Sequence, residues 1–265
     1  MVFPYKTVLL VGATSGIGAG LADKFIQEGA KVIAVGRRQE RLDAFVQKHG
    51  ADKAAAIKFD ITDRSGLDAF VQRVVKENPT LDCVVLNSGV QQMIRLSRPA
   101  EVDLDAFHRE VNTNFTSVVN LALKFSAVLL EKSPQKTALV VTGTHLSLVP
   151  SVTMPAYSAS KAALHAFVDC LRGQNQDKSC KFIEIATPVV QTELHDYMGE
   201  EHGRSFGMPL DAFIAQVYPQ LERSEEHTSV GIPVGVTSED YSHFVGTRQK
   251  MFDDLSALIL PNMQL

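Results

Sequence analysis

Tyr157 and Lys161 are the residues whose types and spacing best suit proton transfer in this 265-residue sequence. They stand four positions apart near the start of 155–173, a stretch that reads as a long helix, so both side chains lie on one helix face. A free phenol titrates near about 10, but an ammonium group within roughly 4–6 Å favours the phenolate and lowers that pKa. The pair therefore predicts a tyrosine that exchanges a proton with a substrate oxygen.

A glycine-rich turn near the start of the chain has the context of a nucleotide-binding loop. The apolar run 7–11 predicts a strand, the turn 12–18 follows it, and a helical pattern comes next. Glycines let the backbone approach a pyrophosphate, and the helix N-terminus supplies unpaired N–H groups and a positive dipole end. A tight turn without a ligand is the alternative. The residues predicted to contact a cofactor here are Gly12, Thr14, Ser15, Gly16, Ile17 and Gly18.

Two arginines, Arg37 and Arg38, follow the second predicted strand, 31–35. An NAD-binding domain carries an acidic residue at this point, which binds the ribose 2′-hydroxyl. Because a guanidinium group matches the geometry of a phosphate, the sequence predicts that Arg37, together with Arg38, binds the 2′-phosphate of NADP. In the alternative interpretation, Arg38 and Arg41 form a solvated helix face with Glu40.

Short apolar runs alternate with amphipathic helical patterns along the rest of the chain. The further predicted strands are 55–59, 82–86, 138–142, 182–186 and 229–234. One long helix is predicted over 104–131, and a last helical segment over 250–260 has an apolar face that could pack on its own sheet or on a second subunit. This alternation predicts the α/β class, with a doubly wound parallel sheet whose ligand crevice lies at the carboxyl ends of the strands.

Together these motifs resemble the short-chain dehydrogenase/reductase family over about 6–192. The most similar parts are the G-x-x-x-G-x-G spacing of the turn and the Y-x-x-x-K pair. The resemblance implies a single Rossmann-like domain over 1–265, in which about 190–225 forms a substrate flap. The methionines and aromatic residues of that flap suggest an apolar pocket. The implied enzyme uses NADP to reduce a ketone or aldehyde to an alcohol, reversibly, with a tyrosine as general acid and base.

The resemblance also implies roles for individual residues around Tyr157. Tyr157 is the general acid, and Lys161 lowers its pKa and holds the nicotinamide ribose. Thr144, thirteen positions before Tyr157, stands where the family has a serine and polarises the substrate carbonyl, with Ser147 as the competing candidate. His145 is interpreted as a pocket wall or a hydrogen-bonded structural residue.

Asn114 lies inside the predicted helix 104–131, where asparagine is unfavourable. The resemblance implies that it bends the helix and positions a relay water, with Asn112 as the competing candidate. Asp60 is implied to approach the adenine amino group, although it could equally be a helix N-cap. The further cofactor contacts that the resemblance implies at strand ends are Asp60, Ile61, Asn87, Gly89, Pro188, Val190 and Thr192.

Several residues depart from the family pattern. Val11 and Leu86 replace polar residues, Ser88 replaces an alanine, Val189 replaces a glycine, and Thr144 replaces the serine. The departures at Val11, Leu86, Thr144 and Val189 motivate an alternative function, an NADP(H)-binding scaffold with a non-redox or regulatory role. Reduction of an imine or an activated C=C bond with the same residues is a further alternative.

Composition argues against several classes of protein. The formal charge of −4 shows no excess of basic residues of the kind that binds nucleic acid. No uninterrupted apolar stretch approaches the roughly 20 residues that cross a membrane. The histidines and cysteines show no metal-site spacing. Three cysteines, with Cys83 interpreted as a core residue, and a start without an apolar signal core indicate a cytoplasmic protein. The expected partners are a small apolar carbonyl or alcohol substrate and, by resemblance, further copies of this chain in a homodimer or homotetramer.

Overall fold

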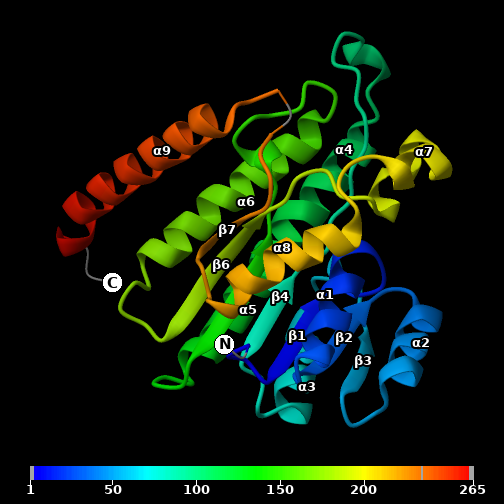
Figure 1. The fold of residues 1–265 in the computed structure, drawn as a ribbon, viewed down its shortest axis with the longest axis vertical. Helices are drawn as coiled ribbons and strands as arrows, with labels where there is room; N and C mark the ends of the chain where they lie inside the picture. Colours follow the sequence, from blue (N-terminus) through cyan, green and yellow to red (C-terminus); the bar gives the residue numbers. More distant parts are fainter. Residues whose placement is uncertain (1–2, 234, 263–265) are drawn as a thin grey trace.

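Short runs of Val, Leu, Ile and Ala form one parallel sheet, because such side chains suit strands that are buried on both faces. The computed structural model describes residues 3–233 and 235–262, and within that part the sheet has seven strands (Figure 1). They are β1 (Thr7–Val11), β2 (Lys31–Gly36), β3 (Ala54–Lys58), β4 (Cys83–Leu86), β5 (Thr137–Thr142), β6 (Cys180–Ala186) and β7 (His227–Ser229), in the order β3-β2-β1-β4-β5-β6-β7. The predicted doubly wound parallel sheet is confirmed, while the extreme ends of the expected domain 1–265 lie outside the described residues.

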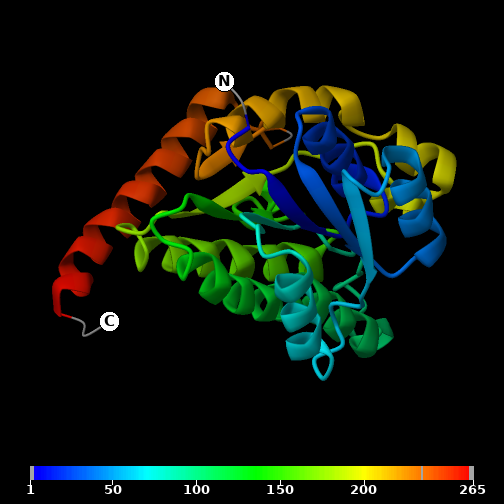
Figure 2. The same cartoon turned by 90° about the horizontal axis from the view of Figure 1, so that it is seen from below.

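Alternate side chains of each strand face two separate cores. The helices are α1 (Gly16–Gln27), α2 (Gln39–His49), α3 (Leu67–Glu77), α4 (Leu104–Val111), α5 (Ser117–Leu130), α6 (Pro155–Gly173), α7 (Glu200–Ser205), α8 (Leu210–Glu222) and α9 (Ser238–Ile259). Val8 and Leu10 of β1 pack with α1, α2 and α8. Leu9 and Val11 pack in the other core, with α3, α5 and α6. Figure 2 shows these two helix layers on either side of the sheet.

The strand order reverses at the middle of the sheet. β1 pairs with β2 on one side and with β4 on the other, so the segments that leave the carboxyl ends of β1 and β4 diverge. A doubly wound sheet binds its ligands in the crevice at such a point. The glycine turn follows β1 there, and α6 carries Tyr157 and Lys161 to the same edge.

The prediction of one continuous helix over 104–131 is wrong. α4 ends at a π-helical turn, Asn112–Thr116, from which α5 continues. Within this turn Asn114 hydrogen-bonds both backbone groups of Val90, in the loop after β4. A π-helical turn widens a helix locally and is common at functional sites. The break therefore follows from a tertiary contact, and Asn114 is at its centre.

The helical stretch Leu104–Leu130 has the length and mean hydropathy, 1.3, of a membrane-spanning helix. Its α5 part nevertheless packs in the core, because Val118, Leu121 and Phe125 are fully buried against the sheet. Of the apolar window, 44% is buried inside the protein. A core helix of an α/β protein passes the same length and composition test, and we interpret the stretch in that way.

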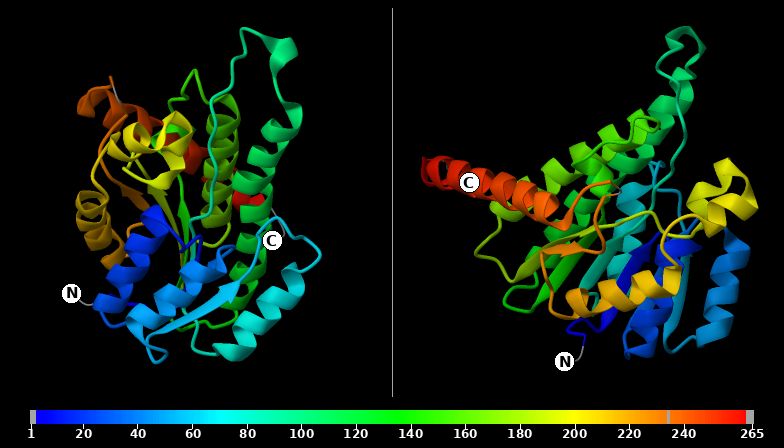
Figure 3. Two further views of the ribbon diagram at one scale, coloured as in Figure 1. Left: turned by 90° about the vertical axis from the view of Figure 1, so that its right-hand side faces the viewer. Right: turned by 45° about the horizontal axis from the view of Figure 1, so that its top comes forward.

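The C-terminal part of the chain departs most from the sequence prediction. The last strand begins two residues earlier in the chain than the expected 229–234, as β7 (His227–Ser229). Residue 234 lies outside the described part. The helix expected at 250–260 is the second half of the longer α9. Its residues Met251, Leu255 and Leu258 are each more than half exposed, so this face does not pack on the sheet. Figure 3 shows α9 projecting past the sheet, and the loop before α4 projecting in another direction.

Candidate active site

A cavity of about 520 Å³ opens at the carboxyl ends of the strands and gathers most of the predicted site residues. The predicted residues that line it are Gly12, Thr14, Ser15, Gly16, Ile17, Arg37, Arg38, Asp60, Ile61, Asn87, Gly89, Tyr157, Lys161 and Thr192. Five predicted residues are not among those that line it. These are Gly18, Asn114, Thr144, Pro188 and Val190. The cavity is thus shared by the two ends of the proposed site, the proton-transfer residues and the arginines.

The glycine turn has the shape that close approach of a pyrophosphate requires. Gly12 adopts a φ of +89°, and a side chain there would collide with Ser88. A Cβ atom on Gly18 would lie 2.0 Å from the Gly12 carbonyl oxygen, so Gly18 supports the turn from behind. Ser15 precedes α1 and its side chain does not cap the helix in the described structure. The first N–H groups of α1 therefore suit an anionic ligand, and the turn fits a dinucleotide.

The departures Val11 and Leu86 are accommodated together. They are register partners in the β1–β4 pair, and both are buried. Beyond them Asn87 donates its side-chain amide to the Gly12 carbonyl oxygen at 3.1 Å and accepts from the Thr142 hydroxyl at 2.9 Å. Replacing both members of a polar pair by apolar residues leaves no unpaired group. The nearby crosslink through Asn87 keeps the three strand ends together.

Lys161 is buried directly beneath the cavity. Its ammonium group donates to the Thr142 carbonyl oxygen at 2.7 Å and lies 5.8 Å from the centre of the Tyr157 ring. Only 3% of the residue is exposed. Burial lowers the pKa of Lys161 to about 8, against an opposing effect of Glu184. The side chain can therefore exchange a proton near neutral pH.

Tyr157 is also buried, and this reverses the predicted direction of its pKa shift. Burial raises the pKa of the phenol above its usual value of 10, and the charge of Glu110 acts in the same direction. A hydrogen bond with the Thr144 hydroxyl opposes the shift. The spacing of Tyr157 and Lys161 predicts a lowered pKa, and this prediction is wrong because the ammonium group is bonded to a carbonyl oxygen instead. Tyr157 is accordingly held as a neutral phenol, which is the form that donates a proton.

Thr144 is the hydroxyl that meets Tyr157, as the thirteen-residue spacing predicts. It donates to the Thr187 carbonyl oxygen at 3.2 Å, which fixes its orientation. The competing residue, Ser147, donates to the Thr144 carbonyl oxygen at 2.7 Å. His145 is buried and contacts Ser229 at 3.2 Å, and burial lowers its pKa to about 4. A neutral, enclosed imidazole agrees with the structural interpretation of His145.

Asn114, and not Asn112, faces the site. Asn114 is fully buried, while Asn112 is exposed. The Asn114 side chain accepts from the Val90 N–H group and donates to the Val90 carbonyl oxygen, both at 2.8 Å. Its amide also donates to the Ser160 hydroxyl at 3.3 Å. We call Asn114, Thr144, Tyr157, Ser160 and Lys161 the buried floor of the site.

Glu110 is a residue beside the buried floor that the motifs in the sequence do not predict. It is 2% exposed, and neither carboxyl oxygen has a hydrogen bond of normal geometry among the described residues. Burial raises the pKa of Glu110 to about 7, and nearby Gln92 opposes this shift. The sequence does carry a signal for Glu110. It stands three positions after Phe107 and four before Asn114, so this acidic residue shares a helix face with both.

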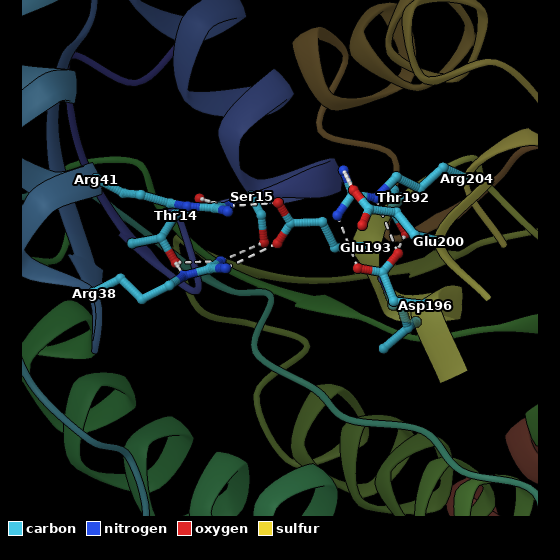
Figure 4. A network of polar contacts seen from close by, with 10 residues as sticks. Thr14, Ser15, Arg38, Arg41, Thr192, Glu193, Asp196, Glu200 and Arg204 are labelled. Carbon is cyan, nitrogen blue, oxygen red and sulfur yellow. Dashed lines mark hydrogen bonds and ion pairs between the residues drawn. The ribbon is translucent and has the colours of Figure 1, made fainter. Parts of the chain in front are cut away.

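The opposite end of the cavity is charged and more exposed (Figure 4). Arg38 donates to Glu193 at 2.8 Å, to the Ser15 hydroxyl at 2.7 Å and to the Thr14 hydroxyl at 3.0 Å. Arg41 donates to the second oxygen of Glu193 at 2.6 Å. The interpretation of Arg38 and Arg41 as a solvated helix face with Glu40 is therefore wrong. The pairing was not visible in the sequence because Glu193 lies more than 150 positions further along.

Arg37 and Asp60 complete this charged end. Arg37 lies 3.9 Å from the Asp60 carboxylate, and its side chain is 69% exposed. Asp60 accepts from the backbone and the hydroxyl of Thr62, whereas α3 begins after Gly66. The N-cap alternative for Asp60 is therefore wrong. We call Arg37, Arg38, Arg41, Asp60 and Glu193 the arginine rim.

The segment after β6 folds over the cavity but differs from prediction in detail. Thr187 lines the cavity, whereas Pro188 does not, and Val190 is buried in the core beside Met208. Thr192 does line it and caps the short 3₁₀ helix Glu193–Met198. The side chains that follow, Leu194 and Tyr197, face the same cavity. This segment therefore connects the arginine rim to the substrate side.

The chain is similar to known oxidoreductases in its sequence. Residues 6–203 match a family described as short chain dehydrogenase. The chain is 34% identical over 222 residues to the uncharacterized oxidoreductase DltE of Bacillus subtilis, and the matched region covers 83% of this chain and 86% of DltE. It is 29% identical over 238 residues to the benzil reductase IRC24 of Saccharomyces cerevisiae, covering 88% and 89% of the two chains. A short-chain dehydrogenase of Sphingobium yanoikuyae, in complex with NADPH, has a TM-score of 0.80 at 23% identity, over 94% of this chain and 96% of that one.

Proposed function

The chain is an oxidoreductase that belongs to the short-chain dehydrogenase family, and we propose that it reduces a ketone or aldehyde to an alcohol with NADPH. The observation that carries the proposal is the meeting of two hydroxyl groups, Tyr157 and Thr144, above the buried ammonium group of Lys161. These groups can bind and protonate a carbonyl oxygen. The same residues run the reverse oxidation when the phenol accepts the proton.

The residues of the buried floor supply orientation and a proton. The nicotinamide cofactor supplies the hydride when bound. Thr144 holds the substrate oxygen by a hydrogen bond and polarises the carbonyl group. Tyr157 gives its phenolic proton to that oxygen as negative charge develops there. A pKa raised by burial keeps this proton on Tyr157 until the developing alkoxide, a stronger base, takes it.

Lys161 returns a proton to the site for another turnover, and Asn114 keeps the site in place. The pKa of Lys161, about 8, suits an ammonium group that returns a proton toward the tyrosine. Asn114 fixes the loop at Val90 against α6 through three hydrogen bonds, which hold the floor in one arrangement. Precise placement of this kind contributes to rate by orienting the reacting groups.

The preference for NADPH is supported by the arginine rim. Arg37 and Arg38 line the cavity at the end where the family's adenosine ribose lies, and Thr14 and Ser15 add hydroxyl groups. Guanidinium groups suit a 2′-phosphate. The Sphingobium relative binds NADPH, whereas other similar folds are known with NADH or NAD, so the relatives alone leave both cofactors open.

An apolar substrate is supported by the side chains that close the cavity. Tyr197 and Gln91 line it, and both contact Met154, which stands just before α6. Val90 and Leu194 add apolar side chains to the same lining. Apolar and aromatic side chains around a cavity suit an apolar ligand. The yeast relative is named for benzil, an aromatic diketone.

The test is titration of the purified protein with NADPH and NADH by fluorescence, followed by a panel of ketones, aldehydes and quinones. We expect tighter binding of NADPH and its oxidation in the presence of an aromatic or other apolar carbonyl compound. Binding without oxidation across the panel would contradict the reductase and favour the scaffold alternative, whose motivation lies in the departures at Val11, Leu86, Thr144 and Val189.

A further inference from the structure

Glu193 binds the guanidinium groups of Arg38 and Arg41 (Figure 4), and Arg38 is one of the two arginines proposed to bind the 2′-phosphate. Its two carboxylate oxygens accept from Arg38 at 2.8 Å and from Arg41 at 2.6 Å. Arg38 also donates to the hydroxyl groups of Thr14 and Ser15. Guanidinium groups and hydroxyls arranged around one anion would equally suit a phosphate. In this structure the anion is the Glu193 carboxylate.

The charges of the arginine rim favour exchange of one anion for another. Three arginines against two carboxylates, Asp60 and Glu193, leave a net charge of +1. Without Glu193 the net charge is +2, which balances a phosphate group carrying about −1.5 to −2. A phosphate and Glu193 on the same arginines would repel each other. The two anions therefore compete for Arg38.

Glu193 is held by ion pairs but is not enclosed. Its side chain is 28% exposed, and those of Arg38 and Arg41 are 37% and 40% exposed. Although burial opposes the shift, hydrogen bonds from Arg38 and Arg41 lower the pKa of Glu193, so the carboxylate is charged at neutral pH. Ion pairs of this exposure are weak enough to be exchanged.

We propose that Glu193 is a displaceable stand-in for the 2′-phosphate of NADP, so that binding of this phosphate releases the segment that begins at Glu193. The inference rests on the proposed function for its ligand. The segment begins with the cap Thr192 and continues through Leu194 and Tyr197, which line the substrate side of the same cavity. Release of Glu193 thereby links occupation of the arginine rim to rearrangement of the residues that meet the substrate.

The variant Glu193→Gln tests this competition, because it keeps the size of the side chain and removes the charge. The probes are adenosine 2′,5′-bisphosphate and adenosine 5′-monophosphate, measured by calorimetry, so no turnover is required. We expect Glu193→Gln to bind the bisphosphate about threefold to tenfold more tightly than the wild type and to bind the monophosphate equally well.

Glu200→Gln is the matched control. Glu200 follows the segment, at the start of α7, and pairs with Arg204 at 2.7 Å rather than with Arg37, Arg38 or Arg41, so its loss of charge should leave both affinities unchanged. A second readout is amide hydrogen exchange over 193–198. There the bisphosphate should speed exchange in the wild type, and Glu193→Gln should exchange fast without any ligand.

The outcomes separate this inference from the proposed function. If the wild type prefers the bisphosphate but Glu193→Gln binds it no more tightly, the proposed displacement of Glu193 is wrong, while the proposed preference for NADP stands. If Glu193→Gln tightens both nucleotides equally, the effect is general opening of the segment, which also overturns the stand-in. If neither protein distinguishes the two nucleotides, the proposed preference for NADP falls together with the stand-in.

Discussion

The buried floor and the arginine rim lie at two ends of one cavity but are built in opposite ways. The floor consists of enclosed side chains, such as Lys161 and Asn114, whose polar atoms are bonded to backbone groups or to one another. The rim consists of exposed or half-buried charges that pair with each other, such as Arg38 with Glu193. The floor can therefore hold one geometry, while the rim can exchange partners.

The difference has an energetic basis. A buried polar group left without its partner costs about 1–3 kcal/mol, so the floor tolerates little rearrangement. An exposed ion pair contributes about 0–1 kcal/mol and is screened by salt, so the rim can give up one anion for another. In the proposed reaction the fixed end places the proton donor, and the exchangeable end responds to the cofactor.

The largest effect is expected from Asn114→Ala in the floor. This change leaves the Val90 N–H and carbonyl groups and the Ser160 hydroxyl without their present partner. We expect a loss of about 3–4 kcal/mol in the free energy of unfolding, measured by urea denaturation. The variant protein that remains folded should also show a lower kcat for the proposed reduction. Asn112→Ala, at an exposed position two residues earlier, is the control and should change stability by less than about 0.5 kcal/mol. Equal stability of both variants would show that the floor is not fixed as described.

A smaller effect, dependent on pH, is expected from Glu110 beside the floor. Its pKa in the folded protein is about 7, above the ordinary value of 4.5, so the folded state binds the proton more tightly than the unfolded state. The resulting stabilisation is complete below pH 4.5 and is lost as the pH rises to about 7 and beyond. We expect the wild type to lose roughly 2 kcal/mol more than Glu110→Gln between pH 5 and pH 8.

The control for this pH dependence is Glu101→Gln, because the Glu101 side chain is 67% exposed. That variant should follow the wild type across the whole range in denaturant titrations. Parallel curves for the wild type and Glu110→Gln would mean that the Glu110 carboxyl is solvated or paired, and the floor would be less enclosed at that edge than we describe.

The smallest effect is expected from Arg37→Ala in the rim. Arg37 is exposed and lies 3.9 Å from Asp60, so its contribution to a bound phosphate is screened. We expect about a fivefold loss of NADPH affinity at low salt, near 1 kcal/mol, with NADH affinity unchanged. The loss should shrink as salt is added. Arg73→Ala, which removes an exposed arginine paired with Glu77, is the control. An equal loss for NADH would place Arg37 away from the 2′-phosphate.

Much of the fold and of the floor could be predicted because their signals are local. Apolar runs gave the strands to within one or two residues up to β6, and the glycine turn and the Tyr157–Lys161 spacing placed those residues at the strand ends. The position of Asn114 was also visible, as an unfavourable residue in a helical pattern. The break around it was not, since it depends on hydrogen bonds to Val90, 24 positions away.

The rim and the pKa of Tyr157 could not be predicted because they depend on the assembled structure. Glu193 reaches Arg41 from 152 positions away, and no local pattern links them. The expected lowering of the Tyr157 pKa considered only its neighbour Lys161, whereas the observed direction is set by burial and by Glu110. The short β7 and the long α9 follow a region where the pattern of apolar residues is weak, so their bounds were set by packing.

In the proposed reaction Tyr157 donates the proton and does not hold the cofactor's phosphates, and Tyr157→Phe tests this role most directly. The measurement is turnover of NADPH with the best carbonyl substrate, beside NADPH affinity by fluorescence titration, for the wild type and Tyr157→Phe. We predict a fall in kcat of about 10²–10⁴-fold, the usual contribution of a general acid, with NADPH affinity changed by less than about threefold. Unchanged turnover in the variant, or a loss of turnover matched by an equal loss of NADPH binding, would contradict the assignment.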